Sequence, residues 1–148
     1  NISDEETLLE KFHHMMNIPQ TTAILMQPML SGTQIFIGAK REGNFGHLIL
    51  CGLGGIFVET LKDINYSLSP VSRVEADEMI RTLRSYRILE GTRGQEGVNI
   101  PMFSEAVRRV SALCQAAPEI FEMDINPLMA GTRQITAVDA RIRIEKER

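Results

Sequence analysis

Three polar residues near the C-terminal end of the chain could together bind a hard metal ion. Asp124 and Asn126 alternate with apolar residues in segment 121–126, so in a strand their side chains lie on the same face. Asp139 interrupts the next apolar run, and a turn near Gly131–Thr132 predicts that it lies opposite Asp124 on that face. Two carboxylates this close repel each other unless a cation or a proton neutralises one of them. Because Mg²⁺ binds carboxylate oxygens and shares phosphate oxygens, the pattern indicates a magnesium–nucleotide site. A solvated face with ordinary exposed acids remains the alternative.

Two glycine-rich segments could contact the phosphates of such a nucleotide. In Gly52–Gly55 the residues Gly54 and Gly55 allow a bend that exposes backbone amides to an anion or lets a ligand pack closely. A generic tight turn is the simpler alternative for this segment. In Gly91–Gly94 the glycines flank Arg93, whose guanidinium could reach a phosphate. An exposed loop arginine is the alternative there.

The elements that must position these residues follow from apolar periodicity and from turn residues. A helix is expected over 4–16, a second after the capping box Ser72–Glu75, and a third from Pro101 to the residues before Pro118. Short apolar runs separated by glycines predict strands. The expected strands are 23–29, 34–40, 48–51, 56–61, 65–69, 120–126 and 135–144. The fold class is therefore α+β, with a mostly antiparallel sheet packed with helices.

The composition excludes several classes of protein. The chain has 148 residues, of which 43% are hydrophobic and 24% charged, as in one soluble globular domain. Sixteen basic and 19 acidic residues form no basic patch, so a nucleic-acid partner is not expected. No apolar run approaches the roughly 18–20 residues of a membrane span. Cys51 and Cys114 have no paired spacing, which favours reduced core thiols in a cytoplasmic protein.

Several short segments follow one another in a fixed order: Leu25–Met29, Ile37–Arg41, Phe45–Gly46, Gly52–Glu59, Gly91–Gly94, Asp124–Leu128 and Val138–Arg141. This series resembles the ATP-grasp region of the NDP-forming acyl-CoA synthetases, which include ADP-forming acetate–CoA ligase and are related to the succinyl-CoA synthetase β subunit. It runs from about Leu25 to Ile142. Glu42 and His47 depart from the usual family residues, near a turn where we expect no effect on chemistry.

The resemblance implies roles for individual residues. It implies an ATP-grasp lobe that binds ATP or ADP together with Mg²⁺. Phosphate binding or active-site organisation is implied for Glu59 and Arg93, which are the candidate catalytic residues. The residues implied to contact the nucleotide are Gln27, Pro28 and Met29 beside the adenine, with Gly54 and Gly55. The implied metal ligands are Asp124, Asn126 and Asp139.

The resemblance also implies that residues 1–148 are the C-terminal portion of an ATP-grasp domain in a larger enzyme. That enzyme would interconvert acyl-CoA, ADP and phosphate with a carboxylic acid, CoA and ATP by phosphoryl transfer. Its expected partners are the other ATP-grasp lobe, with a phosphate-binding lysine, and a domain or subunit that binds coenzyme A and carries a phosphorylated histidine. The fragment alone is expected to be inactive and to self-associate through its uncovered surface. The alternative is a non-catalytic nucleotide-binding or assembly domain of a regulatory or acetyltransferase-fused relative.

Overall fold

The structure is a computed structural model that describes residues 2–55, 62–92, 94 and 96–145. The chain divides into two compact units, residues 1–30 and 31–148, and each is described by itself. No helix in these described ranges is long and apolar enough to cross a bilayer.

The first unit contains one helix followed by an irregular segment. Helix α1 (Glu5–Met16) confirms the predicted helix, and the Asp4 carboxylate caps it by accepting a hydrogen bond from the Thr7 amide at 2.8 Å. The strand predicted over 23–29 is wrong, because residues 21–30 form neither strand nor helix. Its apolar side chains are exposed, with Leu25 at 81% and Met29 at 77%. Apolar content alone cannot make a strand when no neighbouring strand pairs with it.

The second unit is built on one antiparallel sheet. Its order is β3-β2-β1-β4-β5, and β6 also pairs with β4. The fold class predicted from the sequence is therefore confirmed. The strands are β1 (Thr33–Arg41), β2 (His47–Leu53), β3 (Ile64–Leu68), β4 (Ile120–Ala130), β5 (Ile135–Ala137) and β6 (Ala140–Ile144), with a 3₁₀ turn, η1 (Gly43–Phe45), between β1 and β2.

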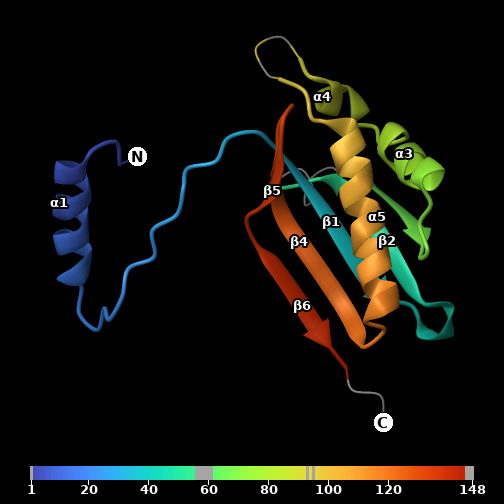
Figure 1. Ribbon diagram of the computed structural model, residues 1–148, viewed down its shortest axis with the longest axis horizontal. Helices are drawn as coiled ribbons and strands as arrows, with labels where there is room; N and C mark the ends of the chain where they lie inside the picture. Colours follow the sequence, from blue (N-terminus) through green and yellow to red (C-terminus); the bar gives the residue numbers. More distant parts are fainter. Residues whose placement is uncertain (1, 56–61, 93, 95, 146–148) are drawn as a thin grey trace. The chain divides into compact units, whose positions relative to one another are not determined.

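Helices cover one face of this sheet, as Figure 1 shows. They are α3 (Arg73–Arg81), α4 (Tyr86–Glu90) and α5 (Ile100–Ala116). The predicted capping box at Ser72 and Glu75 is present at the start of α3. α4 was not predicted, since five residues are too few to show helical periodicity. The helices and the sheet enclose a core that includes Ile35, Ile37, Ile49, Ile80, Leu89, Phe103, Val107 and Met123.

Both cysteines are free and buried in this core, as predicted. Burial raises the pKa of the Cys51 thiol to about 12, because the thiolate is poorly solvated there. The thiol is therefore protonated and unreactive at neutral pH.

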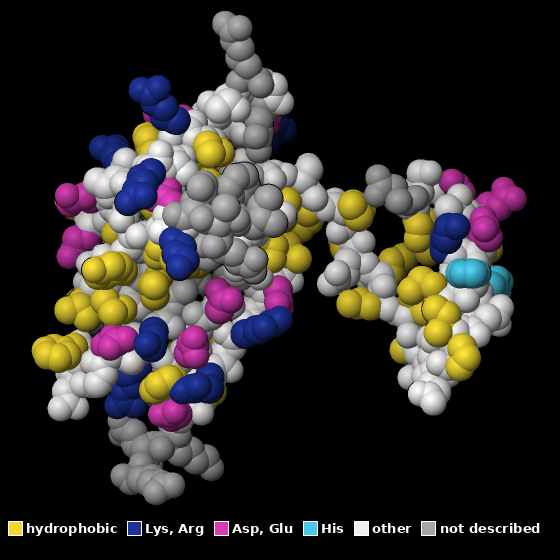
Figure 2. All heavy atoms as spheres, turned by 180° about the vertical axis from the view of Figure 1, so that it is seen from behind, with side chains coloured by type: hydrophobic (Ala, Val, Ile, Leu, Met, Phe, Trp, Pro, Cys, Tyr) yellow, Lys and Arg dark blue, Asp and Glu magenta, His cyan; other side chains and the backbone are white. Residues whose placement is uncertain are grey.

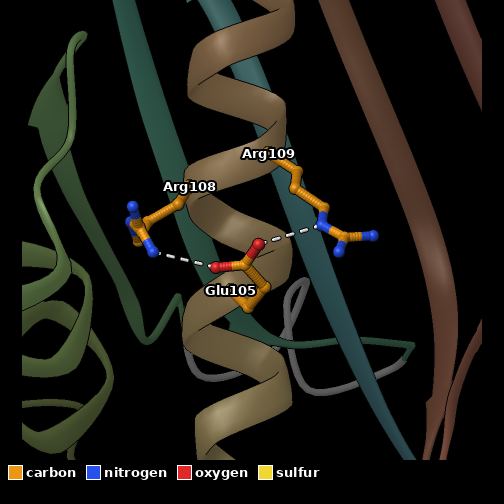
Figure 3. A network of polar contacts seen from close by, with 3 residues as sticks. All are labelled: Glu105, Arg108 and Arg109. Carbon is orange, nitrogen blue, oxygen red and sulfur yellow. Dashed lines mark hydrogen bonds and ion pairs between the residues drawn. The ribbon is translucent and has the colours of Figure 1, made fainter.

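The exposed side of α5 carries charged residues. Glu105 accepts hydrogen bonds from Arg108 at 2.9 Å and from Arg109 at 3.0 Å, one through each carboxylate oxygen (Figure 3). These pairs have the i,i+3 and i,i+4 spacing that brings side chains together on a helix surface. They are solvent-exposed and contribute little to stability.

Two of the predicted strands, 56–61 and 135–144, do not correspond to a single strand in the described part of the chain. The strand predicted over 56–61 lies outside the described residues. The single strand predicted over 135–144 is wrong, because it is broken at Val138 and Asp139 into β5 and β6. Asp139 therefore lies at the junction of two short strands, and both of these strands pair with β4.

Candidate functional site

Strands β4 and β6 bring the three predicted metal ligands to one part of the sheet. The backbone N–H of Asn126 donates a hydrogen bond to the backbone carbonyl of Asp139 at 3.2 Å, so these two residues lie opposite each other. Asp124 lies opposite Arg141 instead. The prediction that Asp139 opposes Asp124 is therefore wrong by two residues. The turn is closed by the bond from the Gly131 amide to the Gln134 carbonyl, so it is centred further along the chain than predicted.

This shift in register does not move any side chain to the other face. Side chains alternate with a period of two, so a shift of two residues keeps the face unchanged. Met123, the neighbour of Asp124, is buried in the core, whereas Asp124 is exposed on the face without helices. Asp124 and Asp139 are close enough for their charges to interact.

The electrostatics of the site reflect this closeness. Partial burial raises the pKa of the Asp124 carboxyl, and the Arg141 guanidinium opposes that effect. The negative charges of Asp139 and Glu122 raise this pKa further. The Arg141 Nε atom lies 3.6 Å from Asp139 Oδ2, and both side chains are largely exposed. Asp124 and Asp139 thus lie beside the Arg141 guanidinium, and Glu122 acts on Asp124 only as a neighbouring charge.

The glycine segment after β2 packs directly against Asn126. The Gly55 amide donates to Asn126 Oδ1 at 3.4 Å, and the Gly54 amide donates to the Gln34 carbonyl at 2.7 Å. A Cβ atom on Gly54 would lie 2.8 Å from the Ile35 carbonyl oxygen and 3.2 Å from Asn126 Oδ1. Glycine is therefore required here for close approach to β1 and β4.

The expectation that these two amides are exposed to an anion is wrong. Both are hydrogen-bonded inside the protein, and Gly54 is buried. The segment instead holds the Asn126 side chain in place. Sequence reasoning missed Gln34, whose side chain occupies the space that a Cβ on Gly55 would need. The sequence feature that could have identified Gln34 is its position as a polar residue at the start of the otherwise apolar strand β1.

The structure does not place the other predicted site residues relative to this group. Glu59 and Arg93 lie outside the described residues. Gln27, Pro28 and Met29 belong to the first unit, where they follow α1 in the irregular segment. Gln27 contributes to an apolar hollow of about 530 Å³ within that unit, next to α1 residues such as Phe12.

The residues present fit Mg²⁺. The site offers carboxylate oxygens from Asp124 and Asp139 and an amide oxygen from Asn126, which are hard ligands. The partly exposed edge leaves room for water and phosphate oxygens, which Mg²⁺ usually retains. The described residues contain no group of three or more His, Cys, Asp or Glu side chains arranged to bind a metal by themselves.

Curated relatives match most of this chain. One is the ADP-forming acetate–CoA ligase I subunit beta of Pyrococcus furiosus, 36% identical over 96% of this chain and 65% of that subunit. Another is the ADP-forming acetate–CoA ligase I of Archaeoglobus fulgidus, 38% identical over 84% of this chain and 18% of that protein. The chain thus spans less than two thirds of each of these relatives.

A solved structure and a family model agree with this similarity. The dinucleotide-forming acetyl-coenzyme A synthetase 1 of Ca. Korarchaeum cryptofilum superposes with a TM-score of 0.82 at 32% identity, over 98% of this chain and 66% of that chain. The model of the ATP-grasp domain matches residues 1–144. The chain therefore belongs to the ATP-grasp domain family, in the group that contains the ADP-forming acetate–CoA ligases.

Proposed function

We propose that this chain is the C-terminal portion of the ATP-grasp domain of an ADP-forming acyl-CoA synthetase, in which it binds Mg²⁺ and a nucleotide. One observation carries the proposal. Asn126 and Asp139 are paired across β4 and β6, the Asp139 charge acts on Asp124, and Asn126 contacts the Gly54–Gly55 segment. Neighbouring carboxylate and amide oxygens beside a glycine segment support a magnesium site.

Each group of residues has a task in this proposal. Mg²⁺, when bound, would neutralise the negative charge of the phosphates, which is a usual means of catalysis in phosphoryl transfer. Asp124, Asn126 and Asp139 hold and orient this ion, and the Gly55 amide keeps the Asn126 oxygen in position. The segment Gln27–Met29 lies beside the adenine. Glu59 and Arg93 organise the phosphates.

The relatives support the wider enzyme reaction. The Korarchaeum protein was solved with coenzyme A and Mg-AMPPCP, with a phosphohistidine segment pointing towards its nucleotide-binding site. The Pyrococcus relative is a beta subunit. We propose that the present chain works with a partner domain or subunit that binds coenzyme A and carries such a histidine, in the cytoplasm. The enzyme would interconvert acyl-CoA, ADP and phosphate with a carboxylic acid, CoA and ATP.

The test is Asp139→Asn in the complete enzyme. It removes one carboxylate charge and keeps the side-chain size. We expect Mg-ADP binding, measured by isothermal titration, to weaken about tenfold or more, because charge-assisted contacts contribute roughly 1.5–3 kcal/mol each. ATP formation from acetyl-CoA, ADP and phosphate should fall as well.

The matched control is Glu122→Gln, which makes the same charge change on the same strand face, next to Arg143. Glu122 is not a proposed ligand, so Mg-ADP affinity in this variant should stay close to that of the wild type. Equal affinities in Asp139→Asn and in the wild type would remove the metal role, and with it the proposal.

A second test concerns the extent of the chain. The second unit has its own sheet, helices and core, so residues 1–148 should fold alone. Without the other lobe, they should bind Mg-ATP weakly and produce no acetyl-CoA, because catalysis depends on positioned charges from both sides of the nucleotide. Turnover by the isolated chain would show that the site is complete within it.

A further inference from the structure

The Arg141 guanidinium lies beside two of the proposed metal ligands. It lies opposite Asp124 in the pairing of β4 with β6, and its Nε atom is 3.6 Å from Asp139 Oδ2. Its positive charge also acts to lower the pKa of Asp124, although burial dominates and the net shift is upward. One guanidinium therefore interacts with two of the three proposed ligands.

This interaction is weak enough to be exchanged. The Arg141 side chain is 84% exposed, and the distance to Asp139 is long for a charge-assisted hydrogen bond. Exposed ion pairs of this kind contribute little to stability, and a long flexible side chain can leave them readily. A divalent ion on Asp124 and Asp139 would neutralise these carboxylates and repel the guanidinium.

The released guanidinium would have one strong alternative partner. Arginine binds phosphate oxygens with the same planar fork that it offers to carboxylates. A nucleotide that shares its phosphate oxygens with the metal brings this anion to the same edge of the sheet.

We propose that Arg141 exchanges partners at this site: it pairs with the ligand carboxylates while the metal is absent, and it binds the phosphates of the metal–nucleotide once the metal has replaced it. This inference rests on the proposed function. It gives Arg141 two opposite effects, since it competes with the free metal but assists the metal–nucleotide.

The neighbouring Arg143 provides a matched control. It lies two residues further along β6 and carries the same charge. Its partners are different, namely Glu122 at 4.0 Å, Glu145 at 3.2 Å and the ring of Phe121 at 3.9 Å. None of these is a proposed ligand, so Arg143 should not exchange partners.

The experiment measures Mn²⁺ alone and then Mn-ADP on the complete enzyme. Free Mn²⁺ is followed by electron paramagnetic resonance, and ADP binding is titrated calorimetrically at saturating Mn²⁺. In Arg141→Gln, Mn²⁺ alone should bind about two- to fivefold more tightly, as expected from losing a weak competing ion pair. Mn-ADP should bind about tenfold more weakly, because a charged hydrogen bond to phosphate is lost. Arg141→Lys keeps the charge and should leave Mn²⁺ affinity unchanged, and Arg143→Gln should change neither affinity.

The outcomes separate this inference from the proposed function. If Asp139→Asn abolishes Mn²⁺ binding while Arg141→Gln changes neither affinity, or shifts both in the same direction, the partner exchange is wrong and the metal site stands. If Asp139→Asn leaves Mn²⁺ binding intact, the metal site itself is wrong, and the inference falls with it. Opposite shifts in Arg141→Gln, absent from Arg143→Gln, support the exchange.

Discussion

The two faces of the sheet are shaped by different physical requirements. The face under α3 and α5 is packed with fully buried apolar side chains, so its residues are fixed by volume and by removal from water. On the opposite side of the molecule, acidic and basic side chains lie among hydrophobic ones at the surface (Figure 2). There, the residues that matter are fixed by strand register and charge. Changes on the covered face should therefore affect the free energy of unfolding, and changes on the open face should affect ligand binding.

The largest effect on stability is expected at Phe103. This side chain is 0% exposed, and Phe103→Ala should lower the free energy of unfolding by about 3–5 kcal/mol through lost burial and a cavity. Urea denaturation followed by circular dichroism measures this. The control Met102→Ala, at the adjacent and 38% exposed position, should cost much less. Similar costs for the two variants would contradict the packing of α5 on the sheet.

Gly54 packs against both the β1 backbone and the Asn126 side chain. Its substitution should therefore affect both the free energy of unfolding and ligand binding. A Cβ atom in Gly54→Ala would collide with the Ile35 carbonyl and press on Asn126 Oδ1, so we expect a loss of about 1–3 kcal/mol. Mg-ADP binding should weaken as well. In the control Gly38→Ala, the added Cβ meets neighbours only at 3.5 Å or more, so both properties should change little. Normal Mg-ADP affinity in a folded Gly54→Ala variant would separate the glycine segment from the site.

Asp63 should give a smaller and pH-dependent effect. Its carboxylate accepts hydrogen bonds from the amides of Arg84 at 3.0 Å and Ser85 at 2.7 Å, which connect the segment before α4 to the residues before β3. Burial acts to raise the pKa of Asp63, but the hydrogen bonds from Ser85 and Arg84 outweigh it, and the net shift is downward. By analogy with helix capping, Asp63→Ala should cost about 1 kcal/mol at neutral pH.

The sign of the pH dependence follows from that lowered pKa. The stabilisation by Asp63 is fully present above its unfolded pKa, which is about 3.8, and is lost as the pH falls through the lower folded value. The difference in unfolding free energy between wild type and Asp63→Ala should therefore shrink in strongly acidic solution. Urea denaturation at several pH values measures it, and a difference that grows towards low pH would contradict this account.

The smallest effect on stability is expected at Asp139. Its side chain is 55% exposed, and its pair with Arg141 is long, so Asp139→Asn should change the free energy of unfolding by less than about 0.5 kcal/mol. Thermal unfolding without ligand measures this. In the presence of Mg-ADP, only the wild type should gain substantial stability, because ligand binding stabilises the folded state. A large loss without ligand would mean that Asp139 has a structural role, and the comparison between the faces would fail.

Features with local signals along the chain could be predicted without the structure. The alternation around Asp124 and Asn126 was enough to place both on one strand face, and the capping box at Ser72 marked the start of α3. The helix predicted from Pro101 onward corresponds to α5, whose buried side includes Phe103, Val107 and Cys114. These features depend on residues only a few positions apart, so their physics can be read along the chain.

The way in which distant segments meet could not be predicted from local patterns. The register of β4 and β6 places Asp139 opposite Asn126 and Arg141 opposite Asp124. The turn from Gly131 to Gln134 is centred further along the chain than expected, so each residue of β4 has a partner two residues away from the predicted one. The contact of Gly55 with Asn126 joins segments 71 residues apart. Conversely, the apolar segment around Leu25 forms no strand, because a strand exists only where another strand pairs with it. Alternation fixes which face a side chain takes, but the partner across the sheet depends on backbone hydrogen bonds between segments far apart in the sequence.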